Sequence, residues 1–295
     1  MSNNKQQNFY TVFALLLGAF CWGIIWYPYR LMAEAGVSGV VSNFYAYAIT
    51  IIIGCIIFAK HWRGLLPLPK GFIWLSIAAG WTNLAYVLAV IDGEIMRVML
   101  LFYLSPIWTL LLAHFWLKEK THFTAYIAIA ISIFGAFMML YDPKLGGLPL
   151  PKNTAEWLGL SAGMGFSLSN VLTRKSQHLS LAAKSFAVWV GVFLMSTLYM
   201  LVMNVKLLSP SFFTPTHWGI IGIIALLLIA AVLFVQYGVT RIAATRASIL
   251  FLFELVVAAI ASYFLANEAM RWNEWLGGAL IMLAAVFAAS QQAEH

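Results

Sequence analysis

Ionisable side chains inside apolar stretches are the residues of this chain that could do chemistry. Glu254 lies six residues after Ser248 in such a stretch, which places it about 9 Å into a helix at ~1.5 Å a residue. A carboxylate at that depth costs about 2.5–3.5 kcal/mol and usually faces a cavity or a partner. It could bind a substrate amine or exchange protons. The alternative is a carboxylate that only hydrogen-bonds between helices.

Two arginines form a second pair of candidates. Arg97 and Arg246 each stand at the start of an apolar stretch, where each could anchor a substrate carboxylate and act as a gate. The alternative is that each long side chain extends to the membrane interface. Arg246 precedes Glu254 by roughly 12 Å along a helix, so we expect no direct pair between them.

Aromatic and amide side chains supply the other candidates for a substrate-binding cavity. Aromatic residues make up 15% of the chain, and several lie in the middle of apolar stretches rather than at their ends. Such a cavity suits amphipathic metabolites, and its rings could hold an amine by cation–π contact. Packing against lipid is the alternative for each ring. The residues are Trp22, Trp26, Trp81, Asn83, Tyr86, Tyr103, Asn170 and Glu254. The family resemblance given below implies that the spans that carry the rings line a central cavity.

Signatures of metal sites and of ATP-driven transport do not occur in the sequence. It contains no Walker A, HExxH or CxxC motif, and its histidines have no metal-ligand spacing. We therefore expect no catalytic residue, no metal, no cofactor and no enzymatic activity. A lipid-modifying intramembrane enzyme and a non-transporting scaffold are the less favoured alternatives.

The elements that position these candidates are membrane-spanning helices. The 295 residues are 63% hydrophobic and 9% charged, with a mean hydropathy of +0.89, whereas soluble domains are about a quarter charged. A bilayer admits only helices and closed barrels, and apolar runs of about twenty residues without alternation indicate helices. We predict an all-α polytopic membrane protein with ten transmembrane helices at 9–30, 41–59, 72–91, 96–116, 123–141, 156–174, 184–204, 217–238, 247–266 and 274–290.

The basic residues predict the orientation of these spans. Eleven of the 17 lysines and arginines fall on the side of the N-terminus and six on the other side, and cytoplasmic loops carry the excess of basic residues. We expect both termini in the cytoplasm. The net charge of +7 then follows from topology, and no nucleic-acid partner is implied.

The two halves of the sequence resemble each other. At an offset of 149 residues Glu119 pairs with Glu268, and Arg97 pairs with Arg246. A unit of five spans is therefore repeated. Because five is odd, the halves enter the membrane in opposite senses, a recurrent plan of secondary transporters that places a binding site between two gates. The expected units are residues 1–141 and 156–295, joined by a Pro- and Gly-rich linker at 142–155.

Pro106 stands in the middle of the fourth span, where a soluble helix would break. Neighbouring helices in a membrane bundle can bond the carbonyl that it frees, so we expect a kink there. Ten spans in a five-plus-five inverted repeat, with Pro106 followed by Glu119 and with the pair Trp22-Gly23, resemble the EamA-type permeases of the drug/metabolite transporter (DMT) superfamily over nearly the whole chain. Leu255 stands where that family often has a second proline.

The resemblance implies a fold and a function. The fold is a 5+5 inverted-topology repeat around a central cavity in a bacterial-type inner membrane. The function is export of small amphipathic metabolites, most simply amino acids or related compounds, by alternating access. Proton-coupled multidrug efflux is the alternative. The expected partners are a small-molecule substrate and membrane lipid, with the chain acting as a monomer or a weak homodimer.

Overall fold

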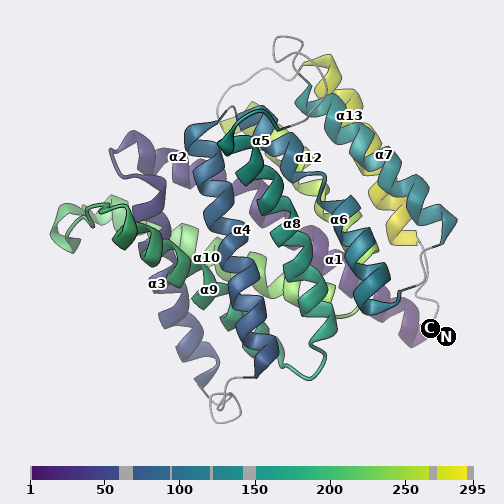
Figure 1. Ribbon diagram of the computed structural model, residues 1–295, viewed down its shortest axis with the longest axis horizontal. Coiled ribbons are helices and arrows are strands. Elements are labelled where there is room, and N and C mark those ends of the chain that lie inside the picture. The colour runs from purple at the N-terminus through teal and green to yellow at the C-terminus, as the bar shows by residue number, and fades with distance from the viewer. Residues whose placement is uncertain are drawn as a thin grey trace.

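The computed structural model describes residues 2–59, 69–93, 95–119, 122–141, 151–265 and 271–290, and all regular structure among them is helical. Each of the ten predicted spans corresponds to one helix or to helices that meet at a bend (Figure 1). The elements are α1 (Ser2–Ile24), α2 (Trp26–Glu34), α3 (Gly39–Ile57), α4 (Lys70–Asp92), α5 (Ile95–Phe102), α6 (Ser105–Leu112), the π-helix η2 (Ala113–Leu117), α7 (Phe123–Leu140), α8 (Thr154–Lys175), α9 (Leu181–Val202), the 3-10 helix η4 (Pro210–Phe212), α10 (Pro215–Val239), α11 (Ala244–Phe251), α12 (Phe253–Leu265) and α13 (Trp272–Ser290).

The lengths and compositions of these helices confirm a polytopic membrane protein. Among the described residues, eight helical segments are long and apolar enough to cross a membrane, and the shorter apolar helix Trp272–Ala288 joins them. The exposed side chains on these segments include Ile56, Leu201 and Phe264, each about 70% exposed. Exposed apolar side chains of this size are expected on a surface that contacts lipid rather than water.

Helix α8 covers the remaining predicted span; it is less apolar than the others and is not among those segments. Small residues let it pack closely against a neighbouring helix. Gly159 and Gly163 stand four residues apart on the face that meets α5. A Cβ atom on Gly163 would lie 2.5 Å from the carbonyl oxygen of Phe102. Small residues at such spacing let membrane helices approach closely.

The fourth span is interrupted beside that contact. Helix α5 ends at Phe102 and α6 begins at Ser105, with Pro106 in its first turn. Pro106 has no N–H to offer the Phe102 carbonyl four residues earlier, and that carbonyl lies against Gly163 instead. Ser167 of α8 donates to the Ser105 carbonyl at 2.8 Å, so the bend is held by α8.

The ninth span is interrupted as well, although it contains no proline. Helix α11 ends at Phe251 and α12 begins at Phe253. At the junction, Leu252 N–H donates to Ile249 and Leu255 N–H donates to Leu252, so bonds over three residues replace bonds over four. Such a tight turn redirects a helix.

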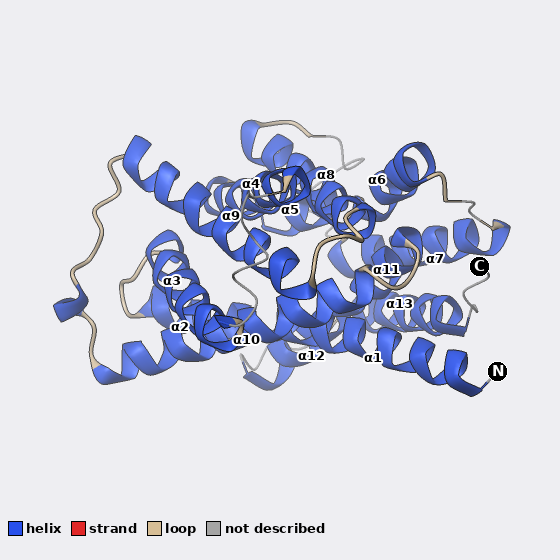
Figure 2. Ribbon diagram, turned by 90° about the horizontal axis from the view of Figure 1, so that it is seen from below, coloured by secondary structure: helices blue, strands red, loops and turns tan. Residues whose placement is uncertain are grey.

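The two broken spans run in opposite directions through the molecule. The backbone N–H of Ala244, where α11 starts, donates to Glu119, which directly follows the end of the fourth span. The fifth and tenth spans, α7 and α13, lie side by side in both Figure 1 and Figure 2, and a Cβ atom on Gly135 would meet the Gly277 carbonyl at 2.7 Å. The fourth span is thus a close neighbour of the ninth, and the fifth is a close neighbour of the tenth.

Candidate functional site

The breaks in the two interrupted spans meet at a hydrogen bond. The Tyr103 hydroxyl, between α5 and α6, donates to Oε1 of Glu254 at 2.7 Å. Glu254 is half-buried and lies in the first turn of α12, whereas Tyr103 is buried. The partial positive charge at a helix N-terminus stabilises a carboxylate in that position. The arrangement holds one acidic group in the middle of the bundle with part of its surface open.

Aromatic rings extend from this carboxylate across four helices, α4, α5, α8 and α11. Tyr86 of α4 is close enough to interact electrostatically with Glu254. Its ring centroid lies 5.1 Å from that of Phe102, which in turn lies 5.6 Å from Phe166; Phe166 lies 5.3 Å from Phe251. A carboxylate beside aromatic faces suits a protonated amine carried on an apolar body.

A network of amides and hydroxyls lies near α4, one turn before Tyr86 in the helix. Asn43 of α3 donates to Asn83 Oδ1 at 2.8 Å and to Ser196 Oγ at 3.1 Å, and it accepts from the Tyr29 hydroxyl at 2.8 Å. Asn83 precedes Tyr86 by three residues, so both side chains share one face of α4, about 4.5 Å apart along its axis. Neutral polar groups therefore continue from the acidic site toward α2, α3 and α9.

The two arginines that sequence reasoning singled out are both buried, at 6% exposure each. Arg97 donates to both oxygens of Glu156, from Nε at 2.7 Å and from Nη2 at 2.9 Å. Arg246 donates from Nε to the Ala288 carbonyl of α13. Each guanidinium is thus bonded inside the protein in this conformation.

The predicted cavity residue Asn170 lies in helix α8. It is 3% exposed, and its Nδ2 atom has no hydrogen-bond partner among the described residues. Thr109 of α6 is fully buried with an unpartnered hydroxyl as well. Unsatisfied polar groups of this kind are costly in a low-dielectric interior, so a polar partner would stabilise each of them.

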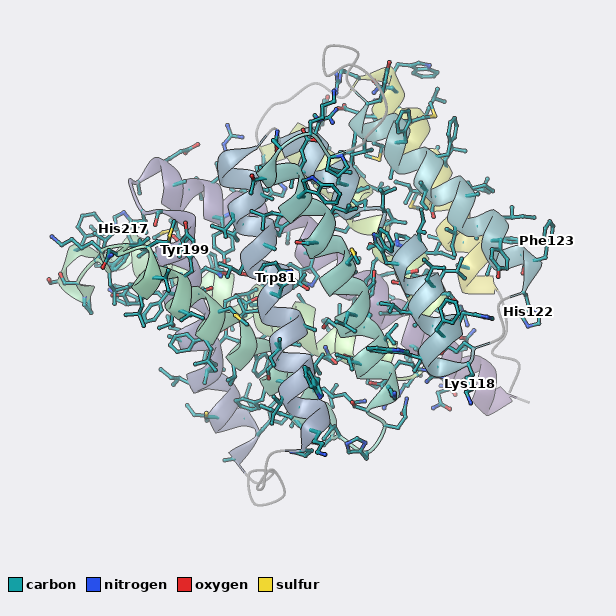
Figure 3. All side chains as sticks on the ribbon, in the orientation of Figure 1. Trp81, Lys118, His122, Phe123, Tyr199 and His217 are labelled. Atoms are coloured by element: carbon teal, nitrogen blue, oxygen red, sulfur yellow. The ribbon has the colours of Figure 1, made fainter. Side chains whose placement is uncertain are left out.

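The three predicted tryptophans lie in three different helices, α1, α2 and α4. Trp22 is half-buried and packs between two groups of core residues, while Trp26 is half-buried at the start of α2 with its ring 5.7 Å from that of Tyr27. Trp81 is 42% exposed on α4, near the middle of the view in Figure 3. Within the described part of the chain, no ring contact or hydrogen bond joins Trp81 to Glu254.

Glu119 forms a junction at the end of the fourth span. Its Oε1 lies 3.4 Å from Nε of Arg174 on α8, and its Oε2 accepts from the Ala244 N–H at 3.1 Å. Burial raises the pKa of Glu119, and Arg174 and the Ala244 N–H partly oppose that shift. The counterpart at Glu268 lies outside the described residues.

Residues 159–163 also spell G-x-S-x-G, the pattern of a hydrolase nucleophile elbow. That elbow needs a strand-to-helix turn, whereas these residues lie within continuous helix α8. The Ser161 hydroxyl donates to the Leu158 carbonyl at 2.8 Å in the same helix. The glycines serve helix packing here.

Sequence reasoning missed three groups of residues that shape this site. Glu156 holds Arg97, Asn43 organises the amide network, and Phe102, Phe166 and Phe251 form the row of rings. A signal existed for Glu156, because it begins a span on the membrane side predicted for Arg97. Asn43 was detectable as a polar residue in an apolar span, but the phenylalanines were indistinguishable from lipid-facing rings.

Comparisons with known proteins agree with this architecture. The model of the EamA-like transporter family matches residues 9–141 and 153–290. An uncharacterized transporter of Pseudomonas aeruginosa is 23% identical over 57% of this chain and 55% of its own length, so the match spans about half of that relative. An uncharacterized transporter of Archaeoglobus fulgidus is 24% identical over 70% of this chain and 72% of its own. A solved structure, titled only as the crystal structure of a protein, has a TM-score of 0.76 at 15% identity over 97% of this chain and 99% of that one, which shows a shared fold.

Proposed function

Because the chain belongs to the EamA-like transporter family, we propose that it is a secondary transporter that exports small amphipathic metabolites, amino acids or related compounds, by alternating access. The relatives are named transporters, and neither the family nor those names indicate catalytic activity. The observation that carries the proposal is the Glu254 carboxylate, half-buried and bonded to Tyr103 where two broken spans meet.

In this proposal Glu254 binds the amino group of the substrate. An ammonium would replace or share the Tyr103 hydrogen bond and gain a charge-assisted one. The rings of Tyr86 and Phe102 would contact the apolar part of the substrate, and the amides of Asn83 and Asn43 would meet its polar groups. Arg97 and Arg246 would act at the gates. In this proposal a gate is closed while its arginine is bonded, Arg97 to Glu156 and Arg246 to the Ala288 carbonyl.

Alternating access requires two related units, and several observations support them. Helices α5 (Ile95–Phe102) and α11 (Ala244–Phe251) correspond residue for residue at the offset of 149, so the interruptions that follow them fall at equivalent positions. The two spans also run in opposite directions. The proposed units are residues 1–141 and 156–295, with both termini on the cytoplasmic side of the inner membrane.

Proton-coupled multidrug efflux is the second candidate, and the same carboxylate favours it. A group that can hold either a proton or an organic cation, but not both, couples their opposite movements. Resistance tests separate the two functions: cells that express the protein should resist a broad set of cationic drugs only if efflux is the function.

A ligand screen is the first experiment for either function. The purified protein is heated with a library of amino acids, amines and cationic dyes, because a ligand that binds only the folded state raises Tm. The ligand that raises Tm for the wild type should fail to do so for Glu254→Gln. An equal rise in Tm for the variant would contradict the assignment of Glu254 to the binding site.

A further inference from the structure

The two ends of the spans differ in how their cations are neutralised. At one end Arg30, Arg97 and Arg271 each pair with a carboxylate, at 3.2, 2.7 and 3.4 Å. At the other end Arg174, Lys184 and Arg241 form a cluster of three cations. Among the described residues the structure gives these three one carboxylate, that of Glu119, which already bonds to Arg174 and to a backbone N–H.

Lys184 is the extreme member of this cation cluster, which comprises Arg174, Lys184 and Arg241. It lies in the first turn of α9 and is 1% exposed. Its Nζ donates to the Thr240 hydroxyl at 3.0 Å, although an ammonium has three protons to donate. No carboxylate pairs with it within the described part of the chain. Arg174 and Arg241 are near enough to add repulsion.

The end of α10 offsets only part of this charge. Arg174 donates to the Thr240 carbonyl at 2.6 Å, and Gln177 donates to it at 3.0 Å. A helix C-terminus amounts to about half of one negative elementary charge. Three cations, one carboxylate and half a charge leave a positive excess, of which the charge on Lys184 is buried. A bound anion would compensate this excess.

The exposed edge of the cluster has the geometry of a phosphate binder. Arg241 is exposed and its Cζ atom lies over the Tyr237 ring, 3.6 Å from the ring centroid, while its Nη1 donates to the Tyr237 carbonyl at 2.9 Å. A stacked guanidinium keeps its donor edge fixed for a planar or tetrahedral anion. Arg174 is 24% exposed beside it, so two guanidinium groups reach the surface in front of the buried ammonium.

Neighbouring residues place the cluster at the level of lipid headgroups. Lys175, next to Arg174, lies over the ring of Trp116 at 5.5 Å from its centroid, and both side chains are exposed. Tryptophan and lysine are typical of the membrane–water interface. Lys118 directly follows the π-helix η2 at this end (Figure 3). In the proposed topology this face is cytoplasmic, where anionic lipids are enriched.

We propose that Arg174, Arg241 and the buried Lys184 form a binding site for the phosphate of an anionic phospholipid. The two arginines contact the phosphate oxygens, and Lys184 adds its charge from behind. Basic pockets between membrane helices take such headgroups. The bound lipid neutralises the cluster and holds together the ends of α8, α9 and α10.

Thermal unfolding in nanodiscs tests this site without reference to transport. Wild-type protein is compared in phosphatidylcholine alone and in phosphatidylcholine mixed with phosphatidylglycerol. We expect phosphatidylglycerol to raise Tm, because a ligand of the folded state stabilises it, and Arg241→Gln and Lys184→Met to cut that rise at least about twofold. Lys206→Gln, at an exposed residue of the opposite end, should keep the full rise.

Three outcomes overturn the proposal. One is an equal Tm of the wild type in both lipids, and another is an undiminished rise in Arg241→Gln. The third is an equal rise when millimolar inorganic phosphate is added to phosphatidylcholine nanodiscs, which would make the ligand a soluble phosphate. Arg241→Gln keeps the test decisive if Lys184→Met does not fold, since Arg241 is exposed.

Discussion

Arg97 and Glu156 form a buried ion pair in which two hydrogen bonds, of 2.7 and 2.9 Å, join the start of α5 to the start of α8. The same two spans are joined at their other end by Arg174 and Glu119, at 3.4 Å and with partial exposure. The fourth and sixth spans therefore run parallel, and each end is fastened by one ion pair. The pair at Arg97 is the tighter of the two.

Removing one partner of the buried pair should cost more stability than removing one partner of an exposed pair. Glu156→Gln leaves the Arg97 charge uncompensated, and we expect a loss of about 3–5 kcal/mol. Glu274→Gln, which breaks the exposed pair with Arg271, should cost at most about 1 kcal/mol. Chemical unfolding in detergent measures both, and equal losses would contradict the structural role of Glu156.

The close contact between α8 and the bend at Phe102 predicts a strong effect at Gly163. In Gly163→Ala the added methyl group would lie 2.5 Å from the Phe102 carbonyl, so the two helices must separate. We expect Tm to fall, although alanine is the better helix former. Gly219→Ala on α10, where nothing lies within 4 Å, should leave Tm unchanged or raise it. A fall in the Tm of both variants would contradict this prediction, because it would mean that the protein is destabilised by any glycine-to-alanine change in its helices.

The raised pKa of Glu119 predicts a pH dependence with a definite sign. Burial raises this pKa above the usual value of 4.5, so the folded protein keeps the proton at pH values where the unfolded chain has lost it. The contribution of Glu119 to stability is then full below about pH 4.5 and is lost as the pH rises through the raised pKa.

Glu119→Gln should therefore gain stability relative to the wild type as the pH rises above 4.5. The measurement is the difference in Tm between the two proteins from acidic to neutral pH. A wild type that gains on the variant over this range would mean that Arg174 lowers the pKa more than burial raises it.

Single cysteines test the opposed orientation of the two broken spans. In a background with Cys21 and Cys55 replaced by alanine, we expect Lys118→Cys and Arg271→Cys to react with a membrane-impermeant maleimide from opposite sides of the membrane. Both side chains are exposed. Labelling of both from the same side would refute the inverted arrangement of the halves.

Composition and span length were sufficient to predict the helical membrane fold, because a bilayer leaves the backbone so few choices. The site was predictable only in part. Glu254 stood out because an acid in an apolar span is costly. Tyr103 was predicted as one of several cavity residues, but its hydrogen bond to Glu254 was not foreseen. The break at Leu252 had no local signal, since no proline is present and the tight turn depends on packing.

Long-range pairing explains what the sequence left open. Arg97 was expected at a gate or at the interface, yet it bonds Glu156, which lies 59 residues further along the chain. A contact of this kind depends on which spans are neighbours in space. The order of spans predicts their directions through the membrane but leaves their lateral arrangement free.

Transport by the Glu254 variant tests the central claim most directly. The ligand that raises Tm in the screen is used, in labelled form, to measure flux into proteoliposomes that contain the wild type, Glu254→Gln or Glu274→Gln. We expect saturable flux for the wild type and for Glu274→Gln, and a reduction of at least about tenfold for Glu254→Gln, since a charge-assisted bond contributes about 1.5–3 kcal/mol. Undiminished flux through Glu254→Gln would contradict the claim that this carboxylate binds the substrate.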